Sequence, residues 1–88
     1  MTWNIRLAKE AEKQLKKLPL DRQEFIRRHL RDMTRDPFAG DVKSLKGKEW
    51  TGRYRKRIGR YRLIFMVSHP ERAVEVSAIL LRSEKTYQ

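Results

Sequence analysis

The sequence contains no cysteine among its 88 residues. Disulfide bonds, thiolate metal ligands and a cysteine nucleophile are therefore excluded, and so is a secreted scaffold held together by disulfides. The first residues, MTWNIRLAKE, lack the basic-then-apolar layout of a signal peptide. No apolar run approaches the roughly 18 residues that cross a bilayer. We therefore expect a cytoplasmic protein with no membrane partner.

The sequence also lacks the motifs of common enzyme classes. It has no G-x-x-x-x-G-K-[ST] phosphate loop, no G-x-S-x-G nucleophile motif, and no His or Asp spacing typical of metal sites. His29 is expected on the apolar face of a helix and His69 in a turn, so a paired-histidine ribonuclease is not indicated. We expect neither a metal ion nor a small-molecule cofactor.

Acidic residues are scarce beside basic ones. The chain has 22 Lys and Arg against 11 Asp and Glu, a net charge of +11 and a pI near 10.6. Such a field attracts polyanions and costs self-repulsion, so it favours a polyanionic partner, most readily RNA. The charge is uneven, because residues 43–62 hold a single acid, Glu49, among nine basic residues: Lys43, Lys46, Lys48, Arg53, Arg55, Lys56, Arg57, Arg60 and Arg62.

The length and hydrophobic content, 39%, suit one small domain over residues 1–88. Alternating apolar residues predict a strand at positions 3–7. A helix with a narrow apolar stripe follows and ends at Pro19. A second helix is predicted from an N-cap at Asp21, with Glu24 in capping-box position, to Asp36.

A loop is predicted at residues 38–51, followed by strands at 52–58, 61–67 and 73–81. The residues between the first two of these strands, Gly59 and Arg60, suit a two-residue hairpin turn. The predicted fold class is α+β with the order β-α-α-β-β-β. We expect an antiparallel sheet with an αα-hairpin packed on one face.

Alternation along the strand at 52–58 places three arginines on one side. Arg53, Arg55 and Arg57 are expected to share a face, opposite Tyr54, Lys56 and Ile58. The tight turn brings Arg62 of the next strand close to this row. Guanidinium groups clustered in this way can grip phosphates bidentately.

The runs DPFAGDVKSLKG and GRYRKRIGRYRLIFMV, followed by an apolar strand that ends near Arg82 and Tyr87, resemble the RelE/ParE superfamily of bacterial toxin–antitoxin toxins. The resemblance covers nearly the whole chain. Its most specific part is Tyr54-Arg55-x-Arg57-Ile58-Gly59-x-Tyr61-Arg62-Leu63, and it is strongest for the RelE-like branch.

The resemblance implies the toxin of a toxin–antitoxin pair. Members of the RelE-like branch are metal-independent endoribonucleases that cut mRNA in the ribosomal A site, using the 2′-hydroxyl to attack the adjacent phosphate. Carried over position by position, the implied catalytic residues are Arg55, Arg57, Arg62, Arg82 and Tyr87. The remaining basic residues are expected to bind RNA or the ribosome: Lys43, Lys46, Lys48, Arg53, Lys56 and Arg60. The implied partners are the ribosome, mRNA and a RelB-like acidic antitoxin.

One departure from the family pattern concerns the general base. Arginines replace two family lysines at Arg55 and Arg57, and a guanidinium does not readily lose a proton. Tyr87 would then carry more of the base role. Two alternatives remain open, a ParE-type toxin that poisons DNA gyrase without cutting nucleic acid, and an RNA-binding module that stacks bases on Trp50, Tyr54 and Tyr61.

Overall fold

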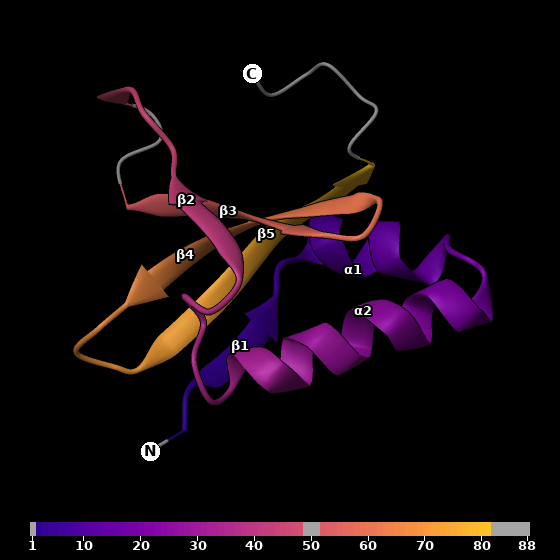
Figure 1. The fold of residues 1–88 in the computed structure, drawn as a ribbon, viewed down its shortest axis with the longest axis horizontal. Helices are drawn as coiled ribbons and strands as arrows, with labels where there is room; N and C mark the ends of the chain where they lie inside the picture. Colours follow the sequence, from indigo (N-terminus) through magenta and orange to yellow (C-terminus); the bar gives the residue numbers. More distant parts are fainter. Residues whose placement is uncertain (1, 49–51, 82–88) are drawn as a thin grey trace.

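The structure is a computed structural model that describes residues 2–48 and 52–81. Its elements follow the order β1 (Asn4–Leu7), α1 (Lys9–Lys16), α2 (Leu20–Met33), β2 (Asp41–Ser44), β3 (Arg53–Ile58), β4 (Tyr61–Ser68) and β5 (Ala73–Leu81). The predicted α+β class is confirmed, with both helices packed on one face of the sheet (Figure 1).

The sheet has five strands in the order β1-β5-β4-β3-β2. Strands β2 to β5 pair in antiparallel fashion, whereas β1 runs parallel to β5. The sheet is therefore mixed, and the expectation of a wholly antiparallel sheet is corrected at this one pair. Alternation shows which side of a strand is buried but not which neighbour it joins, so the direction of β1 was not readable from its residues.

Strand β2 was not predicted, because residues 38–51 were assigned to a loop. It is four residues long and contains one apolar side chain, Val42, so its alternation was too short to detect. Its pairing with β3 puts Asp41 beside Arg57 and Lys43 beside Arg55. The extra strand therefore adds side chains to the face that carries the arginines.

The start of α2 also differs from the prediction. The N-cap is Pro19 rather than Asp21, and no side chain caps the helix. The Pro19 carbonyl oxygen accepts hydrogen bonds from the N–H groups of Arg22 and Gln23, at 3.0 and 2.9 Å. Because proline already has a φ close to helical values, Pro19 suits the position directly before the first residue of α2. The first helix was predicted to end at Pro19, but α1 already ends at Lys16. Helix α2 ends at Met33, three residues before Asp36.

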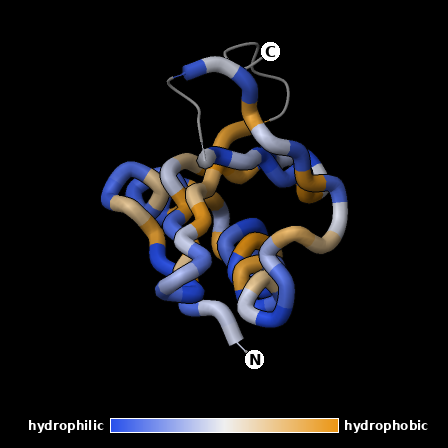
Figure 2. Tube along the Cα trace, turned by 90° about the vertical axis from the view of Figure 1, so that its left-hand side faces the viewer, coloured by the Kyte–Doolittle hydropathy of each residue, from blue (hydrophilic) through white to orange (hydrophobic). Residues whose placement is uncertain are grey.

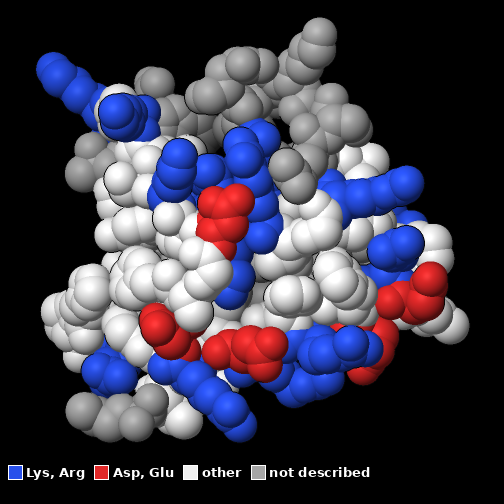
Figure 3. Space-filling view, viewed as in Figure 1, with Lys and Arg blue, Asp and Glu red and all other residues white. Residues whose placement is uncertain are grey.

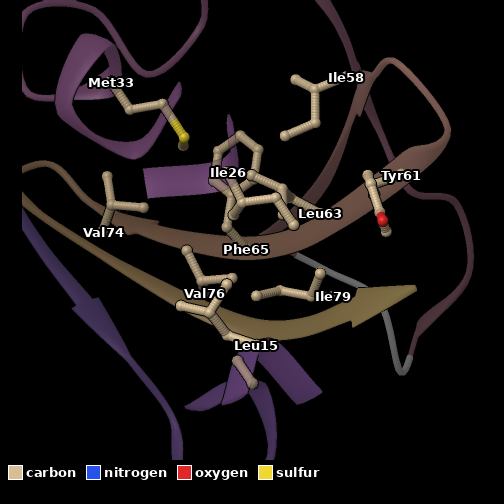
Figure 4. Close-up of a cluster of buried hydrophobic side chains, with 11 residues drawn as sticks. Leu15, Ile26, Met33, Ile58, Tyr61, Leu63, Phe65, Val74, Val76 and Ile79 are labelled. Carbon is tan, nitrogen blue, oxygen red and sulfur yellow. The ribbon is translucent and has the colours of Figure 1, made fainter. Parts of the chain in front are cut away.

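The core lies between the helices and the sheet (Figure 4). Leu15 of α1 and Ile26 and Met33 of α2 pack against the helix-facing side of the central strands. That side is formed mainly by Ile58, Tyr61, Leu63, Phe65, Val74, Val76 and Ile79. Hydrophobic and hydrophilic residues follow one another closely along the trace and do not form separate halves of the molecule (Figure 2). Burial of one sheet face by the helices leaves the opposite face available for binding.

The β3–β4 hairpin connects through Gly59 and Arg60, as predicted. Gly59 has φ +54°, and a Cβ atom there would lie 3.0 Å from Phe25 Cζ. Both the backbone conformation and the contact with α2 favour glycine. This tight turn sets the register that brings Arg57 opposite Arg62.

Candidate nucleic-acid interface

The arginines of β3 and β4 lie on the sheet face that the helices leave uncovered. Two rows of cross-strand partners run across this face. One row consists of Asp41, Arg57, Arg62 and Leu80, and the next consists of Lys43, Arg55, Ile64 and Ala78. We call the set of Arg53, Arg55, Arg57 and Arg62 the arginine face. Basic side chains gather in the region of β2 and β3 in Figure 3, with acidic atoms among them.

Two of these arginines share one carboxylate. Arg55 Nη1 donates to Asp41 Oδ1 at 3.0 Å and to the Asp41 carbonyl oxygen at 3.2 Å. Arg57 Nη1 lies 4.0 Å from Asp41 Oδ2. The hydrogen bond from Arg55 is the main cause that lowers the pKa of Asp41 below its ordinary value of 3.8, and the charges of Arg55, Arg57 and Lys43 act in the same direction. Asp41 is therefore ionised at neutral pH.

The arginines differ in exposure. The side chain of Arg55 is 9% exposed and that of Arg57 is 39% exposed. Arg62 is half-buried, and its Nε is buried. Arg53 is also half-buried and is the cross-strand partner of Met66. The arrangement offers one accessible guanidinium, that of Arg57, directly beside the partly buried Arg62.

The other predicted binding residues are spread more widely. Lys43, Lys46, Lys48 and Arg60 are exposed. Lys43 lies on β2 in the row of Arg55, and Arg60 lies in the β3–β4 turn. Lys56 is in a different place, because it projects toward the helices and is only 6% exposed. It is not part of the arginine face.

Lys56 and His29 form a second group of titratable side chains, on the helix side of the sheet. Burial lowers the pKa of Lys56 from its ordinary 10.5, and the charges of Asp32 and Asp36 partly oppose this shift. Burial also lowers the pKa of His29, and the positive charge of Lys56 adds to the effect. His29 packs edge-on against Phe25, with ring centroids 4.8 Å apart, which fits the expected boundary position.

The aromatic residues and the C-terminal arginine of the predicted site fall into two groups. Arg82 and Tyr87, and the stacking candidate Trp50, lie outside the described residues. Tyr61 is 5% exposed and Tyr54 stacks on Phe65 with ring centroids 5.6 Å apart. These two tyrosines therefore serve as packing residues, and neither is placed as an open platform for a base.

The residue that sequence reasoning missed is Asp41. It lies between Gly40 and a single apolar residue, in a segment that looked like a loop, so nothing indicated that it faces the arginines. The residues Asp41-Val42-Lys43 do alternate between polar and apolar. That short alternation is the one sequence signal of a strand that could pair with residues 53–58.

Metal-binding groups and membrane-spanning helices were sought in the described part of the chain. No group of three or more His, Cys, Asp or Glu residues in residues 2–48 and 52–81 could hold a metal ion. Within the same ranges, no helix is long and apolar enough to cross a membrane.

The sequence and the fold are both similar to toxins of toxin–antitoxin systems. Residues 5–86 match the family model of the ParE toxin of type II toxin–antitoxin systems, parDE. No curated protein matches the sequence. Solved structures resemble the fold closely. The RelBE2 toxin–antitoxin complex of Mycobacterium tuberculosis contains a chain with a TM-score of 0.84 and 23% identity, covering 93% of this chain and 100% of that one.

Two other structures give the same result. In the archaeal RelE–RelB complex of Pyrococcus horikoshii, a chain aligns with a TM-score of 0.80 and 26% identity over 96% of this chain and 99% of that one. The isolated Escherichia coli RelE toxin aligns with a TM-score of 0.72 and 19% identity over 96% of this chain and 88% of that one.

Proposed function

The chain belongs to the ParE toxin family of type II toxin–antitoxin systems, and from its arginine face and its likeness to an archaeal RelE we propose that it is a ribosome-dependent endoribonuclease that cuts mRNA in the A site and thereby stops translation. The observation that supports this proposal is the arginine face, where Arg57 and Arg62 are cross-strand partners on the side of the sheet free of helices. Guanidinium groups aimed at one phosphate stabilise the negative charge that develops on it during transfer.

The proposed reaction is an internal transesterification. The 2′-oxygen of a nucleotide attacks its own 3′-phosphorus, and the bond from that phosphorus to the 5′-oxygen of the next nucleotide breaks. The 2′-hydroxyl gives its proton to a base, and the leaving 5′-oxygen takes a proton from an acid. The products end in a 2′,3′-cyclic phosphate and a 5′-hydroxyl. Arg57 and Arg62 would hold the non-bridging oxygens of the pentacoordinate phosphorus.

The proton transfers need groups other than these arginines. Arg55 and Arg57 serve poorly as bases, because a guanidinium group does not readily give up a proton. Tyr87 is the proposed base, and Arg82 the proposed partner of the phosphate or the leaving oxygen. Both assignments rest on the family resemblance.

The proposal includes partners and a place of action. An acidic antitoxin of the RelB type would bind the toxin and block the arginine face, and the ribosome and mRNA would be its targets in the cytoplasm. Charge supports this, since the chain carries +11 and an acidic partner would neutralise it. The similar chains from Mycobacterium tuberculosis and Pyrococcus horikoshii come from a toxin–antitoxin complex and a RelE–RelB complex.

The deciding experiment is induced expression in a bacterial host followed by primer extension on one translated mRNA. We expect codon-phased cuts that require translation and end in 2′,3′-cyclic phosphate. Arg57→Ala, Arg62→Ala and Tyr87→Phe should each reduce cutting, the arginine variants by about 10²–10³-fold. Lys13→Ala is the matched control, because it removes one charge from exposed α1 and should cut normally. Co-expression of the acidic protein encoded beside the toxin should restore growth.

One alternative is favoured by the matched family model, which describes ParE toxins. If the cells stop growing with DNA replication blocked and no mRNA cuts, the protein is a gyrase-directed toxin and not a nuclease. A 3′-hydroxyl product end would overturn the 2′-hydroxyl mechanism while leaving nuclease activity in place. If expression causes neither growth arrest nor mRNA cuts, the RNA-binding module is the function that remains.

A further inference from the structure

Asp41 contacts two arginines through different oxygens. Its Oδ1 accepts from Arg55 at 3.0 Å, whereas its Oδ2 lies 4.0 Å from Arg57 Nη1. Asp41 is on the edge strand β2 and is the direct cross-strand partner of Arg57. One carboxylate thus spans two neighbouring guanidiniums, as a phosphate with two anionic oxygens would.

The two contacts differ in strength. Arg55 is 9% exposed, and a charge so deeply buried needs a partner, which Asp41 supplies with both its side chain and its backbone carbonyl. Arg57 is much more exposed, and its distance to Asp41 is at the limit of an ion pair. Exposed ion pairs of this kind contribute little. The Arg55 contact should therefore persist, while the Arg57 contact can be exchanged.

The position of Arg57 explains why it attracts an anion. Its other cross-strand partner is Arg62, and like charges directly opposite each other on a sheet repel. An anion near Arg57 relieves this repulsion. In the protein alone Asp41 is that anion. An RNA phosphate bound at this pair would contact Arg57 and Arg62 together, because the two are direct cross-strand partners.

We propose that Asp41 is an internal counter-ion of the arginine face, which an RNA phosphate displaces from Arg57 while Asp41 stays bound to Arg55. The inference rests on the proposed function in one respect, that the arginine face binds RNA. Its consequence is that Asp41 lowers the affinity for RNA, because each bound phosphate must compete with a carboxylate that is already in place.

The test is RNA binding by purified protein. The probe is a short 2′-O-methyl RNA, which cannot be cut, and fluorescence anisotropy at low salt gives the dissociation constant. Asp41→Asn keeps an oxygen that can accept from Arg55 but removes the charge. We expect it to bind about two- to fivefold more tightly than the wild type, the range typical of exposed ion pairs. The gain should shrink as salt rises.

The matched control is Glu75→Gln. Glu75 is exposed on the same sheet face, as the cross-strand partner of Met66 and Arg6, and its loss changes the net charge equally. It should change the affinity by a clearly smaller factor. In an Arg57→Ala background, Asp41→Asn should give no gain, because the arginine that it releases is gone. Thermal unfolding of each variant checks that the fold is kept.

Four outcomes would overturn the inference. Equal gains in RNA affinity for Asp41→Asn and Glu75→Gln would mean that Asp41 acts only through the overall charge of the protein. A full gain for Asp41→Asn in the Arg57→Ala background would mean the same. Weaker binding by Asp41→Asn would make it a support of the site rather than a competitor. A wild type that binds no RNA would also end the proposal. The nuclease proposal is tested separately, by mRNA cuts in cells. If the protein binds RNA as expected but does not cut mRNA, the proposed function is wrong and the role of Asp41 still stands.

Discussion

Three consecutive basic residues of β3 occupy three different environments. Arg55 is buried on the helix-free face and paired with Asp41, Arg57 is exposed on the same face, and Lys56 is buried on the opposite side, near the helices. Sequence alternation predicted the faces correctly. It did not predict burial, because Arg55 and Arg57 have the same residue type and the same phase. Their different exposure follows from the side chains around them.

Lys56 provides a prediction at this scale. Its ammonium group is desolvated, and the charges of Asp32 and Asp36 offset this only in part. Methionine has a similar volume and no charge to desolvate, so Lys56→Met removes the cost of burying the ammonium group. We expect Lys56→Met to raise the free energy of unfolding at pH 7 by about 1 kcal/mol. Urea unfolding measures it. Lys43→Met, on the exposed part of β2, is the control and should change stability by less than about 0.5 kcal/mol.

The same substitution has a pH dependence. The pKa of Lys56 is lower in the folded protein than its ordinary 10.5 in the unfolded chain. Between those two pKa values the unfolded state binds more protons, so this residue makes the wild type more stable as the pH rises. The advantage of Lys56→Met should therefore shrink as the pH approaches 10.5. An advantage that grows with pH, or a loss of stability at pH 7, would contradict this account.

At the scale of elements, α1 completes the hydrogen bonding of β5 where β1 ends. Strand β1 pairs with β5 only as far as Leu7 and Val76, and the Ala8 N–H then donates to the Val76 carbonyl oxygen at 2.9 Å. Farther along β5, the Ile79 N–H donates to the side-chain Oε1 of Gln14, at 2.7 Å. A helix side chain thus takes the place of a strand neighbour.

Gln14 gives the prediction at this scale. Gln14→Met would leave the partly buried N–H of Ile79 without its acceptor, and an unsatisfied group of this kind costs about 1–3 kcal/mol. The loss should appear as a lower urea midpoint. Gln14→Glu keeps an oxygen at the same place and should lose less than half as much. Equal losses in the two variants would show that the packing of Gln14, and not its hydrogen bond, holds α1 on the sheet.

The two faces of the sheet carry different kinds of side chain. The helices and the core occupy one face, and the arginine face lies on the other (Figure 1, Figure 3). Basic residues also lie on the helices, but there they alternate with acids such as Glu10 and Glu12. The excess of +11 therefore acts mainly through the half of the chain that forms the face.

Salt dependence tests this separation. The logarithm of the affinity for single-stranded RNA should fall with the logarithm of salt, with a slope of about −0.7 per phosphate neutralised. Arg57→Ala should make the slope shallower by about that amount, since it removes one phosphate contact. Lys13→Ala removes the same charge from the helix layer and should leave the slope unchanged. Identical slopes for all three proteins would mean that Arg57 does not contact phosphate.

Much of this protein was determined by the sequence alone. The strand at 73–81 and the β3–β4 hairpin have the predicted positions, because long alternating runs and a glycine turn are local signals. The α+β class and the common face of Arg53, Arg55 and Arg57 follow from the same runs, whereas the toxin family was predicted from the resemblance of residues 54–63 and their flanks to its motif. Local sequence could do this because the side-chain period of a strand needs no partner.

The tertiary structure decided what depends on partners. The parallel pairing of β1 with β5 and the addition of β2 are long-range contacts, and neither leaves a mark in a four-residue strand. The same pairing brings Asp41 to Arg55 and Arg57, across 14 residues of chain in the case of the hydrogen bond to Arg55. Arg55 is bonded to Asp41 and buried, whereas Arg57 is exposed. This difference is a property of the folded sheet, because Asp41 belongs to another segment of the sequence.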